Sequence, residues 1–359
     1  MKLFYQLLFV LISCNAVAQQ QLIPMPNSLE QKEGNFSLNQ TTVIVAPQQL
    51  QKLSWYLRNE LQTFGKLSLT AVNQSEKPGI YLSLTNRGKN KVNDEAYTLH
   101  VTSNKVTIAA NTEAGLFYGI TTFLQLVRTA KATNKTLLIP ALVISDQPAY
   151  AWRGLMLDES RAFYGKEKVK AILDWMAFYK LNRFHWHLTD EPGWRLEIKR
   201  YPRLSLVGGI GDYFNPNAPA QYYTQNEIKE IVSYAADRYI TVIPEIDMPG
   251  HATAANMAYP EHSGGGSKAH PEFTFNPGKE NTYQYLTNIV KETNVLFPAG
   301  LIHLGGDEVS YGNEKWKIDP AIAELKKRES LADDKAVERY FMKRMADSVY
   351  QMNSKVLVW

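Results

Sequence analysis

The stretch His303-Leu-Gly-Gly-Asp-Glu-Val309 decides how the second half of this 359-residue chain folds. An apolar segment, residues 301–304, runs through two glycines into a pair of adjacent acids. Glycine allows the backbone to come close to a ligand, and polar groups directly after an apolar strand are typical of the C-terminal rim of a parallel β/α sheet. The stretch therefore predicts a buried strand that carries Asp307 and Glu308 into a pocket.

Four other segments of the second half have the same form. Further strands are predicted at residues 153–157, 183–188, 239–245 and 355–359. Apolar residues at helical spacing predict helices between them, at residues 166–180, 224–237, 282–296 and 332–352. Apolar strands that alternate with amphipathic helices indicate parallel β/α units, and no Gly-rich phosphate-binding motif follows any of these strands. We therefore predict a (β/α)8 TIM-barrel domain over residues 148–359, incomplete because only about five of the eight units are visible.

Residues 19–147 have a different pattern. Strands are predicted at 42–46, 79–84, 97–101 and 105–110, with helices at 48–64 and 111–128. Clusters of Gly, Asn and Asp separate the strands, as expected of turns. The segment Ile144-Ser-Asp-Gln-Pro-Ala-Tyr-Ala-Trp152 is the predicted joint. The sequence thus predicts a small N-terminal α+β domain ahead of the barrel.

The first 18 residues have the pattern of an export signal. Lys2 provides a positive start, residues 3–13 are almost wholly apolar, and Ala16-Val-Ala18 matches a cleavage site. Leu11-Ile-Ser-Cys14 also resembles a bacterial lipobox, so a lipid anchor at Cys14 is the alternative to simple cleavage. Cys14 is the only cysteine, which leaves the chain without a disulfide. An exported chain of this kind fits a bacterial periplasm or cell surface.

The amino-acid composition limits the class of protein and argues against a nucleic-acid partner. The chain is 45% hydrophobic and 21% charged, which is a globular composition and excludes disordered and collagen-like classes. Lys and Arg exceed Asp and Glu by 39 − 35 = 4, and the charges are spread along the chain. The electrostatics therefore give no support to nucleic-acid binding.

The acid pair Asp307-Glu308 is distinguished by its position. The same dipeptide occurs at 94–95, 158–159 and 190–191, and an isolated Asp-Glu is usually a solvated loop. After a buried strand, however, both carboxylates can face one pocket. Neighbouring carboxylates push their pKa values apart, so that one can act as a general acid while the other stays charged. This division suits cleavage of a glycosidic bond.

Other polar and aromatic residues are expected on the same rim. The planar guanidinium of Arg161 could hold two vicinal hydroxyls, and Asp190 on the neighbouring strand could share them or orient the arginine. Trp359, at a strand end, could pack against the apolar face of a sugar. His251 follows Asp247 across a Met-Pro-Gly turn, and we expect these two side chains to contact each other.

A metal-dependent hydrolase is a second hypothesis. Strand alternation places His185 and His187 on one face, the arrangement of an H-x-H metal motif. His251, His303 and Asp307 would complete a plausible ligand set. The alternative is that His185 and His187 are hydrogen-bonded residues of the barrel interior.

Four ordered motifs resemble family 20 of the glycoside hydrolases, the β-N-acetylhexosaminidases. They are Arg153-Gly-Leu-Met-Leu-Asp-Glu-Ser-Arg-Ala-Phe-Tyr164, Leu181-Asn-Arg-Phe-His-Trp-His-Leu-Thr-Asp190, Pro244-Glu-Ile-Asp-Met-Pro-Gly-His251 and the opening stretch. Asn111-Thr-Glu-Ala-Gly-Leu-Phe-Tyr-Gly119 also resembles the N-terminal domain of that family. The resemblance implies exo-acting hydrolysis of terminal β-linked N-acetylhexosamine from oligosaccharides, with no metal or cofactor.

The resemblance also implies a retaining, substrate-assisted mechanism. The 2-acetamido oxygen of the substrate would attack the anomeric carbon and form an oxazolinium ion. Glu308 would be the general acid and then the base, and Asp307 would bind the acetamido N–H and stabilise the positive charge. The remaining matched residues would bind ring hydroxyls (Arg161, Asp190), support the pocket (Asp247, His251) and wall the acetamido group (Trp359).

The sequence departs from the family pattern in two places. Glu191-Pro192 follows Asp190 where the family often has Asp and then Gln. The later strands, which complete the sugar site in the family, are missing. An inactive truncated relative that binds sugars is therefore a third hypothesis.

Overall fold

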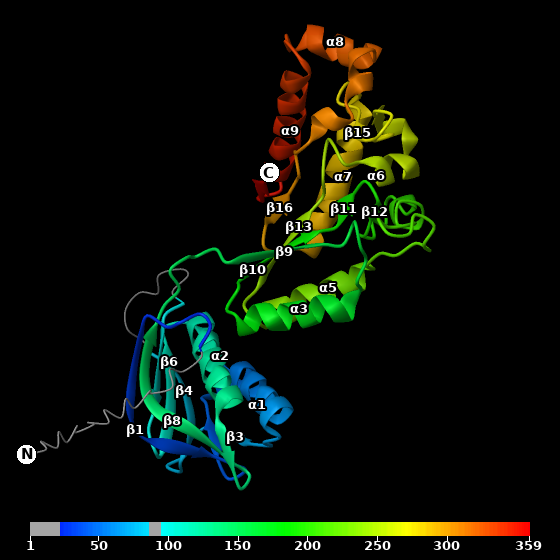
Figure 1. Cartoon of the computed structure of the whole chain (residues 1–359). Coiled ribbons are helices and arrows are strands. Elements are labelled where there is room, and N and C mark those ends of the chain that lie inside the picture. The colour runs from blue at the N-terminus through cyan, green and yellow to red at the C-terminus, as the bar shows by residue number, and fades with distance from the viewer. Residues whose placement is uncertain (1–21, 86–94) are drawn as a thin grey trace, which may run out of the picture. The chain divides into compact units, whose positions relative to one another are not determined.

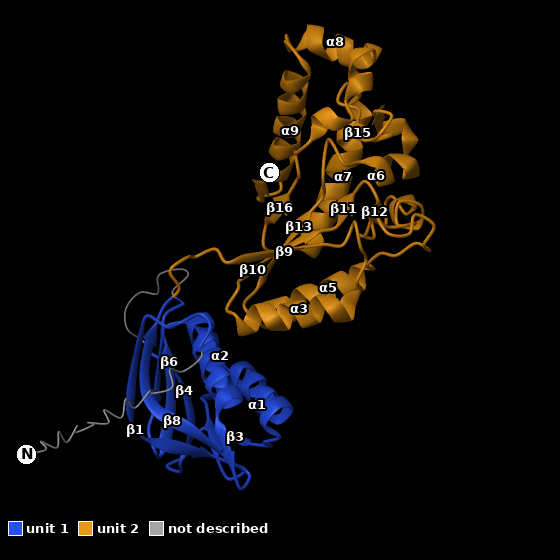
Figure 2. Ribbon diagram, in the orientation of Figure 1, with its two compact units in different colours: residues 1–147 blue, residues 148–359 orange. Residues whose placement is uncertain are grey.

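A computed structural model describes residues 22–85 and 95–359. The chain divides into two compact units, residues 1–147 and 148–359 (Figure 2). The predicted signal at residues 1–18 and the possible lipid anchor at Cys14 lie outside the described residues. Within the described ranges, no helix combines the length and the apolar character needed to span a bilayer.

Unit 1 is an α+β domain, as predicted. Its sheet has the strand order β1-β8-β5-β6-β4-β2-β3, with β7 paired to β8. Helices α1 (Gln51–Gly65) and α2 (Glu113–Thr129) lie on one face of the sheet (Figure 1). The strands are β1 (Ser28–Leu38), β2 (Val43–Val45), β3 (Thr70–Val72), β4 (Gly79–Leu84), β5 (Tyr97–Val101), β6 (Lys105–Ala110), β7 (Lys131–Thr133) and β8 (Thr136–Asp146).

Local sequence explains how α2 begins and what it buries. The Thr112 hydroxyl accepts a hydrogen bond from the amide of Gly115 at 3.1 Å and so caps the helix. From Gly115 to Val127 every residue of α2 is buried. The sequence missed the long antiparallel pair β1–β8, because these two strands lack the regular apolar alternation that marks a half-buried strand.

Unit 2 contains one parallel sheet, and the five strands are those predicted. Their order is β17-β16-β13-β10-β9. Their bounds are β9 (Gly154–Asp158), β10 (Arg183–His187), β13 (Thr241–Glu245), β16 (Leu301–His303) and β17 (Lys355–Leu357). The four predicted helices are also confirmed, as α3 (Lys166–Phe178), α5 (Gln225–Ala236), α7 (Glu280–Leu296) and α9 (Asp334–Tyr350). The partial barrel expected from the sequence is therefore the fold of this unit.

Short elements fill the connections that follow the strands. They are β11 (Thr189–Asp190), β12 (Gly193–Trp194), α4 (Arg203–Leu206), α6 (Thr253–Ala258), β14 (Ser263–Gly265), β15 (Thr274–Phe275) and α8 (Pro320–Arg328), with 3-10 turns at Pro260–His262, Val309–Tyr311 and Glu314–Lys317. They were not predicted, because two to nine residues carry too little periodicity.

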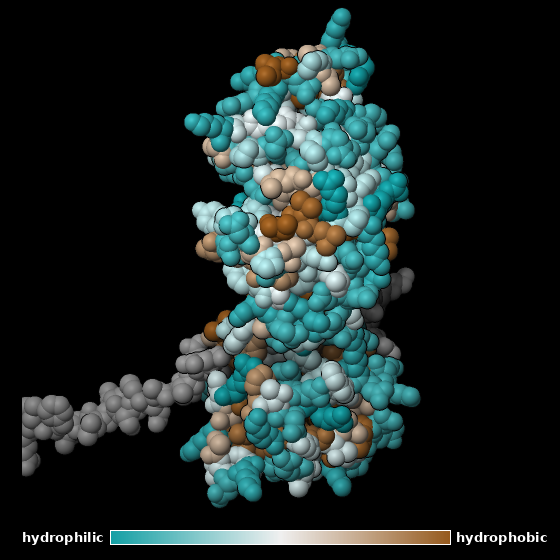
Figure 3. Space-filling view, turned by 90° about the vertical axis from the view of Figure 1, so that its right-hand side faces the viewer, coloured by the Kyte–Doolittle hydropathy of each residue, from teal (hydrophilic) through white to brown (hydrophobic). Residues whose placement is uncertain are grey.

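The inner strands of the sheet are buried and β9 is more open. Phe184, Trp186 and Ile243 have no exposed surface, whereas Met156 on β9 is 45% exposed. β9 and β17 are the two edges of the sheet and each pairs with one neighbour in the described residues. The face of the molecule shown in Figure 3 is mostly hydrophilic. A group of hydrophobic side chains lies at mid-height of unit 2 on this face.

Candidate active site

The parallel register brings the ends of four strands level with one another. His187 at the end of β10 lies opposite Asp158 of β9 and Glu245 of β13, and Glu245 lies opposite His303 of β16. The carboxyl ends of parallel strands share one edge of a sheet, so side chains at and after these positions meet. The predicted site residues are gathered at this rim.

Arg161 is held by two carboxylates. Its Nη2 lies 2.7 Å from Oδ2 of Asp190, and its Nη1 donates to Oδ2 of Asp158 at 2.6 Å. Asp158, which was not among the predicted site residues, also accepts the amide of Arg161 at 3.0 Å. The side chain of Arg161 is 45% exposed, so the residue is accessible to a ligand.

His251 joins the sugar-binding candidates to the acid pair. Its Nδ1 is 2.9 Å from Oδ1 of Asp190. On the other side of the ring, Nε2 is 3.4 Å from Oε2 of Glu308 and 3.8 Å from Oδ2 of Asp307. The side chains of Glu308 and Asp307 are 46% and 33% exposed, so both acids are accessible from solvent.

Charge pairing sets the pKa values in this group. Burial alone would raise the pKa of Asp190, but hydrogen bonds from His187 and His251 and the charge of Arg161 hold it well below its ordinary value. Burial would lower the pKa of His251, and the bond to Asp190 with the nearby negative charges raises it instead. The Asp190–His251 pair is therefore favoured in its charged form.

Asp247 does not make the contact expected of it. Its Oδ1 accepts the amide of Gly306 at 3.4 Å, so the side chain turns toward the glycines after β16, and His251 pairs with Asp190. A Cβ on Gly305 would lie 1.7 Å from Oδ1 of Asp247, so this approach requires glycine. The sequence could not foresee it, because the strand spacing does not fix side-chain direction beyond the strand.

Two of the candidate site residues, His251 and Glu308, lie on strained backbone. His251 and Glu308 both have left-handed conformations, with φ of 53° and 52°. Non-glycine residues adopt this region at a cost, and such residues gather at functional sites. Here the backbone turns both side chains toward the same place.

Asp247 and Glu159 are buried carboxyls with raised pKa values, and Asp247 is the one that faces the acid pair. Burial is the main cause, and the negative charges of Asp307, Glu245 and Asp190 add to it. Asp247 therefore keeps a proton at higher pH than an exposed aspartate does.

Glu245 is a functional candidate that the sequence analysis missed. Its carboxylate lies 2.6 Å from His185 Nε2, 3.1 Å from His303 Nδ1 and 3.2 Å from His187 Nδ1, and it accepts the indole N–H of Trp359 at 2.8 Å. Burial would raise its pKa, but the histidine hydrogen bonds and charges hold it well below the ordinary value. Glu245 could have been identified from the sequence, because it is a charged residue at the end of the apolar strand β13.

His185 and His187 lie on one face, as strand alternation predicted. One donor nitrogen from each of His185 and His303 and one Glu245 oxygen lie within 4.8 Å of one another, which a metal ion could bridge. Both histidines of β10, however, contact Glu245 directly, and His187 Nε2 contacts the carbonyl of Thr189 at 3.0 Å. These contacts match the hydrogen-bonded interior that was the alternative to a metal site.

Trp359 lies beside the histidines of this cluster. Its ring centroid is 4.8 Å from that of His303 and 5.4 Å from that of His185, and the residue is 57% exposed. The indole is thus anchored at its nitrogen while much of its surface is open. This fits the predicted wall of a sugar pocket.

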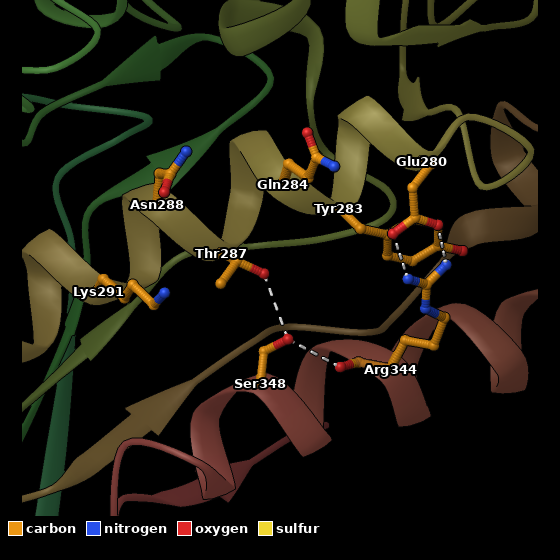
Figure 4. Close-up of a pocket in the computed structure, with 8 residues that line it drawn as sticks. All are labelled: Glu280, Tyr283, Gln284, Thr287, Asn288, Lys291, Arg344 and Ser348. Atoms are coloured by element: carbon orange, nitrogen blue, oxygen red, sulfur yellow. Dashed lines mark hydrogen bonds and ion pairs between the residues drawn. The ribbon is translucent and has the colours of Figure 1, made fainter.

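A hollow lies between α7 and α9, away from the acid pair (Figure 4). Arg344 makes a two-pronged ion pair with Glu280 there, at 2.8 and 2.7 Å. Neither acid of the rim lines this hollow.

Paired acids at the C-terminal edge of parallel β/α units are compatible with one class of protein, the barrel glycoside hydrolases. Comparison with known families agrees. Residues 150–359 match the model of the catalytic domain of glycosyl hydrolase family 20, and residues 19–147 match domain 2 of the same family. The chain belongs to glycosyl hydrolase family 20.

Its relatives include bacterial hexosaminidases. A β-hexosaminidase of Porphyromonas gingivalis is 34% identical over 98% of this chain and 48% of its own length, and one of Vibrio furnissii is 32% identical over 97% and 58%. An exo-β-N-acetylglucosaminidase of Vibrio harveyi, solved with N-acetylglucosamine, superposes with a TM-score of 0.86 at 30% identity over 95% of this chain and 55% of that one. The chain spans about half the length of the curated relatives it matches.

Proposed function

We propose that this chain carries the machinery of an exo-acting β-N-acetylhexosaminidase that removes terminal GlcNAc or GalNAc from oligosaccharides. The observation that carries the proposal is the connection of the acid pair to the hydroxyl-binding candidates. His251 lies between Glu308, at 3.4 Å, and Asp190, at 2.9 Å, and Asp190 holds Arg161 at 2.7 Å. Asp190 and His251 are buried, whereas the side chains of Arg161 and Glu308 at the two ends of this series of contacts are 45% and 46% exposed and open to a substrate.

Glu308 acts first as acid and then as base. Its carboxyl gives a proton to the glycosidic oxygen as the 2-acetamido oxygen attacks the anomeric carbon, which breaks the bond to the leaving group and forms an oxazolinium ion. The Glu308 carboxylate then takes a proton from the water that opens this ion. Two displacements at the same carbon retain the β configuration.

The neighbouring residues bind and stabilise. Asp307 accepts the acetamido N–H and faces the positive charge of the oxazolinium ion. Arg161 and Asp190 bind ring hydroxyls, since a guanidinium provides paired donors and a carboxylate provides acceptors. Trp359 packs against the acetamido methyl group. The contact with Asp190 raises the pKa of His251 and so favours its charged form, which lies 3.4 Å from the Glu308 carboxylate.

We also propose that the chain is exported, with either cleavage after Ala18 or lipidation of Cys14, to a periplasm or cell surface. Residues 1–18 support this through their sequence pattern alone.

The test is release of the aryl group from an aryl β-N-acetylglucosaminide by the full chain, compared with Glu308→Gln. Exposed Glu314 provides the matched control, Glu314→Gln. We expect Glu308→Gln to lose about 10²–10⁴-fold in kcat, the range of general acid catalysis, and the control to lose nothing. Equal turnover in Glu308→Gln and the parent would contradict the role of Glu308, and no turnover in the parent would contradict activity in this chain.

Two further measurements distinguish the substrate-assisted mechanism from the alternatives, one with a different substrate and one with a chelator. An aryl β-glucoside, which lacks the acetamido group, should not be cleaved, because it has no internal nucleophile. Activity that survives prolonged treatment with a chelator is expected. Loss under chelator that is restored by added metal would favour the metal-dependent hydrolase at His185 and His187.

A further inference from the structure

Arg195 is a fully buried arginine whose side-chain N–H groups all donate to backbone carbonyl oxygens. It follows β12 and has no exposed surface. Its five N–H groups donate to five carbonyl oxygens at 2.7–3.1 Å, those of Glu159, Ser160, Gly209, Gly211 and Gln221. Only the planar fork of arginine can serve five acceptors, so a lysine could not replace it.

The five carbonyls belong to two segments that flank Arg161. Glu159 and Ser160 directly precede Arg161 in the chain. The other segment, residues 209–221, reaches Arg161 itself, because the amide of Tyr213 donates to its carbonyl at 2.9 Å. Arg195 therefore ties the turn that carries Arg161 to the loop that packs on its backbone.

The turn is fixed from its inner side as well. The buried carboxylate of Glu159 accepts from the indole of Trp186 at 2.6 Å and from the Tyr223 hydroxyl at 2.7 and 2.8 Å. It also accepts the amides of Tyr164 and Gly165, just beyond Arg161, at 2.9 and 3.2 Å. The chain is thus held before and after Arg161.

Neighbouring residues leave room for the buried guanidinium. A Cβ on Gly193 would lie 2.2 Å from Nη2 of Arg195, so glycine is required there. The Ser160 hydroxyl donates to the carbonyl of Gly193 at 2.6 Å, which closes the same group of contacts. Burying a charge is costly unless its donors are satisfied, and here all of them are.

We infer that Arg195 is a positioning residue for substrate recognition, acting through Arg161. The inference rests on the proposed function, in which Arg161 binds the hydroxyls of the terminal sugar. The side chain of Arg161 forms ion pairs with Asp158 and Asp190. The two residues directly before Arg161 are held by the guanidinium of Arg195, which therefore contributes to the placement of the Arg161 backbone.

The experiment is a double-mutant cycle on the full chain with the aryl β-N-acetylglucosaminide. Arg195→Lys should raise KM and lower kcat/KM by about 10- to 100-fold, since a displacement near 1 Å can have that effect. kcat should change less, and the pH profile should keep its shape, because Glu308 is untouched. Arg344→Lys, in the hollow between α7 and α9, is the matched control and should match the parent (Figure 4).

The cycle separates action through Arg161 from a general loss of structure. Adding Arg195→Lys to Arg161→Met should have little further effect on kcat/KM, because the residue it positions is gone. Losses that multiply in the double variant would overturn the inference, and so would parent-like KM in Arg195→Lys. If Arg195→Lys does not fold, Ser160→Ala, which removes one hydrogen bond of the same group, replaces it in the cycle.

If the parent chain shows no turnover, the proposed function is contradicted. The role of Arg195 is then tested by amide hydrogen exchange. Arg195→Lys should then speed amide exchange in residues 158–165 and 209–221 relative to Arg344→Lys, with the sheet unchanged. Faster exchange throughout unit 2, or none in these two segments, would overturn it.

Discussion

Replacing Glu245 by glutamine tests whether one carboxylate organises the floor of the site. Three histidines and the indole N–H of Trp359 meet this carboxylate within 3.2 Å. Glutamine keeps the shape but has one acceptor oxygen and an NH2 group, so some of these donors lose their acceptor. Leaving part of a buried charged network unpaired costs about 3–5 kcal/mol, and we expect a loss near 3 kcal/mol because one oxygen remains.

The loss of unfolding free energy in Glu245→Gln should depend on pH in a defined direction. The pKa of Glu245 is lowered from 4.5, so its contribution is present above that value and is lost as pH falls through the folded-state pKa. The pKa of His187 is raised from 6.5, so its contribution is present below that value and is lost as pH rises through the folded-state pKa. The destabilisation by Glu245→Gln should therefore be largest between about pH 4.5 and 6.5.

Urea unfolding followed by tryptophan fluorescence is the assay. Six of the seven tryptophans lie in residues 148–359, so the signal reports mainly on unit 2. Glu280→Gln is the control: it removes an ion pair whose carboxylate is 62% exposed and should cost at most about 1 kcal/mol. A loss in Glu245→Gln no larger than in the control, or one constant from pH 4 to 8, would refute the reasoning.

Three further predictions follow from single contacts. Gly305→Ala should destabilise the chain by about 2 kcal/mol or more, since its Cβ would lie 1.7 Å from Asp247; an unchanged melting temperature would contradict this. Thr224→Ala, which removes the capping box of α5, should cost about 1 kcal/mol in urea unfolding, and no loss would mean that the cap is unimportant. Asp190→Asn should weaken the ion pair with Arg161 and so raise KM by about 10- to 100-fold. An unchanged KM in steady-state kinetics would contradict this prediction.

The sequence predicted the sheet of unit 2 well because its strands are strongly apolar and alternate with amphipathic helices. The ends of these strands also indicated Asp307, Glu308, Arg161 and Asp190 from position alone. Periodicity reports on burial of a face, and this is the property that a parallel β/α unit imposes on its residues.

The parts that could not be predicted depend on side-chain direction after the strands end. His251 contacts Asp190, whereas the Asp247 carboxylate lies in the space that Gly305 leaves and accepts the amide of Gly306. The five carbonyls that Arg195 binds come from segments up to 62 positions apart in the chain, between residues 159 and 221. No local pattern contains such an arrangement, because it exists only once the loops have packed.

The charges of the rim favour a cation over a neutral sugar. Asp190 and Glu245 are held ionised by histidines and, for Asp190, by Arg161, so these partners neutralise them. Asp247 is different: burial and the negative charges around it, Asp307 among them, raise its pKa. A positive charge that develops beside Asp307 would oppose the repulsion that contributes to this shift, so Asp247 would ionise more readily in the oxazolinium state than in the substrate complex. In the proposed reaction this coupling favours the oxazolinium state over the bound substrate, because positive charge beside Asp307 lowers the cost of negative charge on Asp247.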